Sequence, residues 1–148
     1  MKNLKVRLTY LAAAVSIVGA AIHVAALAGG PSWYAFFGAP PQVVASAQAG
    51  TWLAPVSTTG IALLMGICAM YACSALGLLR RLPLLRTMLA GIASICLLRA
   101  LILLPLAFTH PELINLFEVA AALTWGAAGM GFVAGFLMTR SKIPAVPA

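Results

Sequence analysis

Two charged residues inside apolar segments are the first candidates for chemistry in this sequence. Arg99 and Glu118 each lie within a stretch that is otherwise long and apolar enough to cross a membrane. An unpaired charge near the bilayer centre costs about 2.5 to 3.5 kcal/mol on insertion scales. With about 1.5 Å of helical rise per residue, Arg99 lies about 13 Å in from Phe108. Glu118 lies about 9 Å in from Glu112 by the same rise, so the two charges have a similar depth and we expect an ion pair between them.

Other polar side chains fall at the same depth. His23 lies about 8 Å from the outer end of the first apolar segment, and Asn115 lies one turn before Glu118 on the same face of the expected fourth helix. The hydroxyls of residues 57–59 enter from the start of the second segment. Each of the four apolar segments therefore supplies polar groups to one layer. The candidate binding residues of this outer polar layer are Arg99, Glu118, His23, Asn115 and Thr58.

The polar layer has two interpretations, and both stay open at this point. In the first it is a binding site, in which Arg99 holds an anionic group and Glu118 or His23 exchanges a proton. In the second it fastens the helices together and encloses a few waters. For His23 alone, a hydrogen bond to a neighbouring helix is the simpler expectation. A hydroxyl in a first helical turn, such as that of Ser57, often bonds to its own backbone.

The sequence carries none of the common catalytic or nucleotide-binding motifs. The glycine-rich run at 126–131 lies inside an expected spanning helix rather than after a strand. The three cysteines have no spacing that would close a metal site. We therefore assign no catalytic residue, no metal and no cofactor, and we favour a protein that is not an enzyme. An intramembrane enzyme with His23 and Glu118 as acid and base is the weakest alternative.

Small residues form a stripe on the expected fourth helix. Ala127, Gly131 and Gly135 recur at a spacing of four, a pattern that lets two membrane helices approach closely. The stripe predicts a helix-packing face, which can meet either another helix of the same chain or a second copy of the chain.

Composition requires that membrane helices position these residues. The 148 residues are 64% hydrophobic and 7% charged, a balance that would leave large apolar patches on a water-soluble domain. Four apolar segments occupy residues 8–28, 52–79, 87–108 and 113–138. The sequence therefore predicts an all-α integral membrane protein, a bundle of four transmembrane helices that forms a single membrane domain over residues 1–148.

Basic residues predict the orientation of the four helices. Eight of the nine lie in three connecting or terminal segments: Lys2, Lys5, Arg7, Arg80, Arg81, Arg86, Arg140 and Lys142. The other two connections contain no lysine or arginine. The positive-inside rule then places both termini in the cytoplasm and the polar layer in the outer half of the membrane.

The first segment has a second interpretation as a cleavable signal peptide. Basic residues precede an apolar run that ends at Ala26-Leu27-Ala28 before Gly29. However, the run is longer than the usual signal core and His23 interrupts it, so we favour a retained helix over cleavage after Ala28.

The long connection between the first two segments is rich in aromatic residues. Trp33, Tyr34, Phe36 and Phe37 lie close together, and side chains of this type gather at the level of the lipid headgroups. Glycines and prolines flank the cluster, and residues 42–49 have the composition of a short helix. We expect an interfacial cap that anchors the protein at the membrane surface, with a lid over a pocket as the alternative.

Helix signals mark the two short connections. Pro83 is expected to open the third helix. Thr109 and Glu112 match a capping box, which would satisfy free amides at the start of the fourth helix. Pro105 removes a hydrogen-bond donor and should bend the third helix close to Arg99.

These features favour an accessory or interaction protein, which would bind a larger membrane partner or a second copy of itself through the small-residue stripe and the aromatic connection. The alternative is a protein that binds or transports a small molecule, lipid or ion through the outer polar layer. The net charge of +7 lies at the ends of apolar segments, so the expected surroundings are the lipid bilayer and no nucleic acid is expected. The compact layout and short basic segments favour a bacterial inner membrane.

Overall fold

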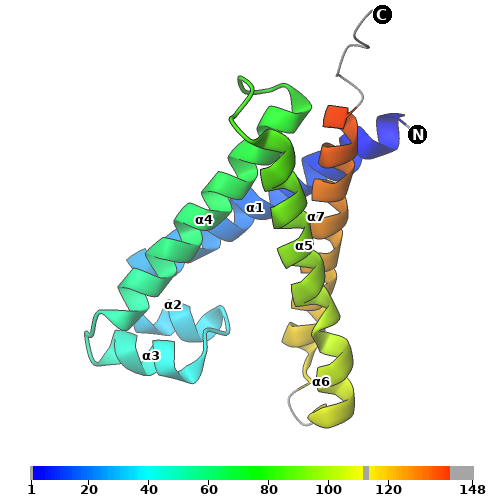
Figure 1. Ribbon diagram of the computed structural model, residues 1–148. Coiled ribbons are helices and arrows are strands. Elements are labelled where there is room, and N and C mark those ends of the chain that lie inside the picture. Colours follow the sequence, from blue (N-terminus) through cyan, green and yellow to red (C-terminus); the bar gives the residue numbers. More distant parts are fainter. Residues whose placement is uncertain (1, 112–113, 141–148) are drawn as a thin grey trace, which may run out of the picture. The chain divides into compact units, whose positions relative to one another are not determined.

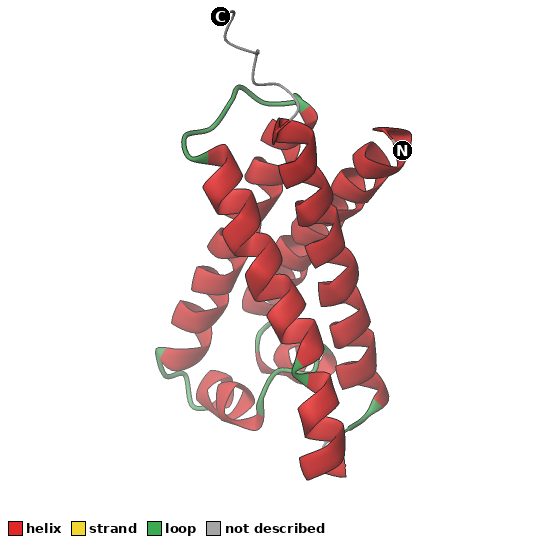
Figure 2. Ribbon diagram, turned by 45° about the vertical axis from the view of Figure 1, so that its right-hand side comes forward, coloured by secondary structure: helices red, strands yellow, loops and turns green. Residues whose placement is uncertain are grey.

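The fold is helical throughout the part of the chain that the structure describes. The computed structural model describes residues 2–111 and 114–140, and every regular element in these ranges is a helix (Figure 2). In chain order the helices are α1 (Lys2–Gly29), α2 (Pro31–Phe36), α3 (Pro41–Gln48), α4 (Leu53–Leu76), α5 (Leu85–Leu101), α6 (Leu103–Thr109) and α7 (Leu116–Arg140).

Four stretches of the described residues are long and apolar enough to cross a membrane: Asn3–Gly29, Leu53–Leu76, Leu85–Thr109 and Leu116–Thr139. The predicted fold class, an all-α membrane protein with four spanning helices, is confirmed. Large side chains such as Ile95 and Leu123 are 67% and 70% exposed, as expected where the surrounding solvent is lipid.

The ends of the spans differ from their predicted positions for local reasons. The first helix begins at Lys2 rather than at Leu8, so its basic residues are part of the helix. The second ends at Leu76 rather than at Leu79, because Gly77 adopts a φ of 80° and the Leu78 amide bonds back to the Cys73 carbonyl at 3.0 Å.

The start of the third span is also different. The expectation that Pro83 opens this helix is wrong, because Leu84 has the left-handed φ of 51° and α5 begins at Leu85. The span is interrupted at Ile102, where α5 ends and α6 begins. This break agrees with the bend predicted from Pro105, which cannot donate to the carbonyl four residues before it.

Two compact units make up the structure. The terminal unit comprises Met1–Val15 and Cys68–Ala148, and the middle unit comprises Ser16–Ile67. Helices α1 and α4 each contribute to both units. That the whole chain acts as one membrane domain stays a prediction.

The core of the terminal unit is built mainly from small side chains. Phe132 and Leu89 are fully buried at its centre, and α5 and α7 pack along each other (Figure 1). Alanines from α1, α4, α5 and α7 fill most of the remaining core: Ala12, Ala13, Ala72, Ala75, Ala93 and Ala128. Small side chains let helix backbones approach closely, which compensates for the weak hydrophobic drive between helices in lipid.

The middle unit contains a pair of short helices. α2 and α3 pack against each other, and Tyr34 is buried in a small cluster with Ala26 and Ala54 (Figure 1). Ser46 joins this pair to the start of α4, because its hydroxyl accepts a hydrogen bond from the Ala54 amide at 3.0 Å and contacts the Thr51 hydroxyl at 2.6 Å. The long connection is therefore folded rather than extended.

Candidate polar site at Arg99 and Glu118

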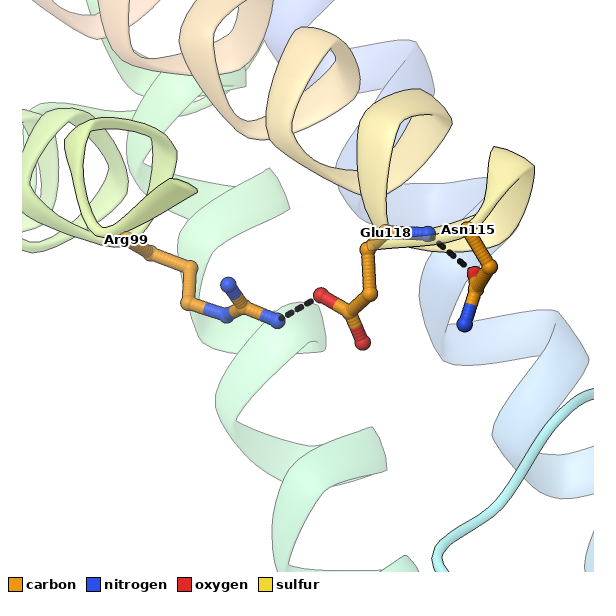
Figure 3. Close-up of polar contacts among 3 residues, drawn as sticks. All are labelled: Arg99, Asn115 and Glu118. Atoms are coloured by element: carbon orange, nitrogen blue, oxygen red, sulfur yellow. Dashed lines mark hydrogen bonds and ion pairs between the residues drawn. The ribbon is translucent and has the colours of Figure 1, made fainter. Parts of the chain in front are cut away.

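The predicted ion pair between the third and fourth spans is present. Arg99 on α5 and Glu118 on α7 point toward each other, and Nη2 of the arginine lies 3.2 Å from Oε2 of the glutamate (Figure 3). The two side chains are 40% and 27% exposed. The pair is thus made by one guanidinium nitrogen and one carboxylate oxygen, and it is open on at least one side.

The two charges lie at helix ends rather than in helix interiors. Glu118 is in the first turn of α7, because this helix begins at Leu116 and not near residue 113, and it is therefore less deep in its helix than predicted. Arg99 is in the last turn of α5, just before the break at Ile102. The negative charge of Glu118, near the N-terminus of α7, is stabilised by the helix dipole. The sequence could not show this, because the apolar stretches continue past both ends.

Asn115 has a different role from the expected one. It precedes α7 instead of lying on this helix one turn before Glu118, and its Oδ1 accepts a hydrogen bond from the Glu118 amide at 3.0 Å (Figure 3). This is an N-cap, in which a side-chain oxygen satisfies an otherwise free amide of the first turn. The hydroxyl of Thr109 donates to the Pro105 carbonyl at 2.9 Å instead of capping α7. Glu112, the other half of the predicted capping box, lies outside the described residues.

The remaining candidate binding residues belong to the middle unit. His23 on α1 bonds through Nδ1 to the Gly19 carbonyl of its own helix at 2.7 Å, and not to a neighbouring helix as expected. Thr58 is buried on α4. Ser57 donates to the Leu53 carbonyl at 2.6 Å, which confirms the expected bond to its own backbone. The structure brings Arg99, Asn115 and Glu118 together; that His23 and Thr58 share their layer stays a prediction.

The aromatic connection is divided between exposed and buried residues. Phe36 is 82% exposed and packs edge-on against Phe37, with ring centroids 5.2 Å apart. Trp33 also contacts Phe37, at 5.8 Å between centroids. Tyr34 is instead only 4% exposed, and its hydroxyl is buried with no hydrogen-bond partner among the described residues. Its role at the lipid headgroups is therefore limited, because its side chain faces the protein.

The small-residue stripe of α7 packs inside the chain. A Cβ added to Gly131 would overlap the Leu8 carbonyl oxygen and come within 2.6 Å of the Ala12 Cβ, both on α1. A Cβ on Gly135 would lie 3.3 Å from the Thr9 side chain. The third member, Ala127, is half-buried one turn earlier. The predicted packing face is thus used within one copy of the chain, between the first and last spanning helices.

One functional candidate was missed by sequence reasoning. Arg86, in the first turn of α5, places its guanidinium over the ring of Phe136 on α7, 5.1 Å from the ring centroid. Its Nε is buried and has no hydrogen-bond partner among the described residues. The sequence shows Arg86 as one of several basic residues that mark a membrane side. Phe136 follows 50 positions later, and nothing in the sequence signals the contact between the two.

Within residues 2–111 and 114–140, no three histidine, cysteine or acidic side chains gather as metal ligands would. No family model, curated protein or solved structure matches this chain. Any functional conclusion therefore depends on the geometry of the polar site itself.

Proposed function

We propose that this chain is a small multi-pass membrane protein that binds an anionic ligand at Arg99, in the outer half of the membrane. The observation that carries the proposal is the single, partly exposed contact between Arg99 and Glu118. A guanidinium has five donors, and the remaining donors of Arg99 have no hydrogen-bond partner among the described residues. A second anion can therefore bind without displacing the glutamate.

The surroundings of the pair favour a ligand that partitions into the membrane. Leu98 and Leu101 on α5 and Leu116 and Phe117 on α7 are all exposed beside the charged residues. α6, which follows the break at Ile102, buries none of its residues. An amphiphile could thus place its charged group on Arg99 and its apolar part along these side chains.

The outward position of the site depends on the proposed topology. Eight basic residues in three segments favour cytoplasmic termini, and the turn between α6 and α7 then lies on the outer side. The same pattern is typical of a protein of the bacterial inner membrane.

Small amphiphiles with one alkyl chain can test the proposal. Decyl phosphate and decanoate carry the anionic groups, and decanol is the uncharged control. We expect the two anions, but not decanol, to raise the Tm of the purified protein by about 2 to 4 °C at saturating concentrations. Arg99→Gln should abolish the shift, whereas Arg7→Gln, which removes one positive charge on the opposite side, should retain it.

The glutamate gives the sharpest control. Because the negative charge of Glu118 repels an anion bound beside it, Glu118→Gln should strengthen binding of decyl phosphate. A folded Arg99→Gln protein that still responds to both anions, or a wild-type protein that responds equally to decanol, would contradict the proposal.

A second candidate function is that of an accessory or interaction protein. It is favoured by the exposed aromatic side chains of the middle unit, Phe36 and Trp52, which are 82% and 72% exposed. The small-residue stripe no longer supports this function, because α1 occupies it. If a larger membrane partner exists, Phe36→Ser with Trp52→Ser should abolish co-purification from cross-linked membranes, whereas Arg99→Gln should not.

A further inference from the structure

The connection at residues 77–84 lies at the opposite end of the α5–α7 pair from Arg99 and Glu118. This connection is held by the end of α4. The Ser74 hydroxyl donates to the Arg80 carbonyl at 3.2 Å and accepts from the Leu82 amide at 3.1 Å. The Tyr71 hydroxyl donates to the Pro83 carbonyl at 3.2 Å. Three hydrogen bonds thus define the backbone that carries the adjacent arginines.

Three arginines belong to this connection and the helical turn after it. Arg80 and Arg81 are exposed. Arg86 is half-buried, and its guanidinium is positioned by the ring of Phe136 at 5.1 Å. The buried Nε of Arg86 is an unpartnered donor among the described residues, and such a donor costs about 1 to 3 kcal/mol unless something accepts from it. An arginine stacked on an aromatic ring loses little further freedom when it binds an anion.

No carboxylate side chain in the described part of the chain pairs with these arginines. Glu118, the acidic residue within residues 2–111 and 114–140, pairs with Arg99 at the other end of the α5–α7 pair. An anion from outside the chain can therefore balance their charge. In a membrane protein, the abundant anion at this depth is the phosphate of a phospholipid headgroup.

We propose that Arg80, Arg81 and Arg86 form a binding site for the headgroup of an anionic phospholipid. Arg86, supported by Phe136, binds the phosphate, because the guanidinium fork matches its oxygens. Arg80 and Arg81 add charge from the fixed connection. Leu78, Leu79 and Leu84 are exposed beside them and contact the acyl chains. The site is separate from Arg99 and does not depend on the function proposed above.

The proposal differs from the general attraction between basic residues and anionic membranes. General attraction depends on the number of charges near the surface, with about 1 kcal/mol for each lysine or arginine. At a site with defined geometry, the affinity for the lipid depends on which arginine is replaced and on the Phe136 ring that Arg86 stacks on. Arg7 on α1 is an exposed basic residue of the same predicted membrane side, so Arg7→Gln is a control with the same change in charge.

The experiment uses the full-length protein in dodecyl maltoside micelles. Its Tm is followed during titration with phosphatidylglycerol, phosphatidylcholine or inorganic phosphate. We expect phosphatidylglycerol alone to raise the Tm. Arg86→Gln should weaken the apparent affinity at least about fivefold, which corresponds to about 1 kcal/mol, whereas Arg7→Gln should weaken it less than about twofold.

Two further variants separate binding from folding. Phe136→Leu keeps every charge but removes the ring, and should weaken the affinity by an intermediate factor. Arg80→Gln with Arg81→Gln changes exposed residues only, so it should fold normally and still lose affinity. The proposal is wrong if Arg7→Gln and Arg86→Gln have equal effects, if phosphatidylcholine acts as strongly as phosphatidylglycerol, or if inorganic phosphate alone gives the full shift.

Discussion

Glu118 makes two interactions that stabilise the start of α7 in different ways. Its amide donates to the Asn115 side chain at 3.0 Å, and its carboxylate accepts from Arg99 at 3.2 Å. The first interaction begins the helix, and the second joins that helix to α5. Because both act through one residue, the cap and the ion pair are expected to support each other.

Replacement of Asn115 tests the cap. Asn115→Ala should lower the free energy of unfolding by about 1 kcal/mol, because the Glu118 amide loses its acceptor. Asn115→Ser can still accept this hydrogen bond and should lose much less. Unfolding in mixed micelles of dodecyl maltoside and SDS measures both values. Equal losses in the two variants would contradict the capping role.

Single and double variants of the ion pair are expected to differ in their free energy of unfolding in a characteristic way. Arg99→Leu leaves Glu118 unpaired and should cost about 1 to 2 kcal/mol, less than for a fully buried pair because both side chains are partly exposed. The double variant with Glu118→Leu should recover at least half of this loss. The same unfolding titration gives the three values. A double variant less stable than either single variant would show that the charges themselves hold the helices together.

Removal of the buried hydroxyl of Tyr34 is expected to raise the stability of the protein. Because this hydroxyl has no partner among the described residues, Tyr34→Phe removes a desolvated polar group and keeps the ring. We expect the free energy of unfolding to rise by about 1 kcal/mol or more. Trp33→Phe is a control on the exposed side of the same helix, where no gain is expected. A loss of stability in Tyr34→Phe would reveal a partner for the hydroxyl in the membrane.

At the scale of elements, the first and last spanning helices approach each other closely. Gly131 leaves no space for a methyl group against the Leu8 carbonyl, and the Thr9 hydroxyl donates to the Gly131 carbonyl at 3.3 Å. Gly126, on the same helix, is different, because an added Cβ would meet only the Ala100 Cβ at 3.6 Å. Gly126 therefore has space for a methyl group, whereas Gly131 does not.

This contrast gives a matched pair of variants. Gly131→Ala should cost about 1 to 3 kcal/mol, because the backbone of α1 must move away. Gly126→Ala should be neutral or stabilising by up to about 1 kcal/mol, since alanine favours the helix. Thermal unfolding of the two proteins measures the difference. If Gly131 instead served a homodimer, Gly131→Ala would change the oligomeric mass and leave the stability of the monomer intact.

At the scale of the whole molecule, charge is separated along the chain's spanning helices. Under the proposed topology, the basic segments face the cytoplasm and both acidic residues lie toward the outer side. We expect a fluorescent protein fused after residue 148 to be fluorescent, and alkaline phosphatase fused after Gln48 to be active, because this enzyme matures only outside the cytoplasm. The opposite pair of results would invert the proposed positions of both sites.

The sequence predicted the helices and the ion pair because both depend on strong local signals. Long apolar stretches define the spans, and two charges inside them must find each other. The cap by Asn115 was misplaced because an apolar stretch does not show where its helix begins. The contacts of Arg86 with Phe136 and of Gly131 with Leu8 were out of reach, because they join residues on different helices and depend on tertiary packing.

The contact between Thr9 and Gly131 can form only late in the synthesis of the chain. Thr9 is made early, but its acceptor is 122 residues later. At about 5 to 20 residues per second, the ribosome needs roughly 6 to 25 s to reach it. Until then the acceptor available to the Thr9 hydroxyl is the Lys5 carbonyl of its own helix, at 2.9 Å in the final structure. The close packing of α1 against α7 can therefore form only after the last spanning helix has been made, and a slower ribosome would delay it.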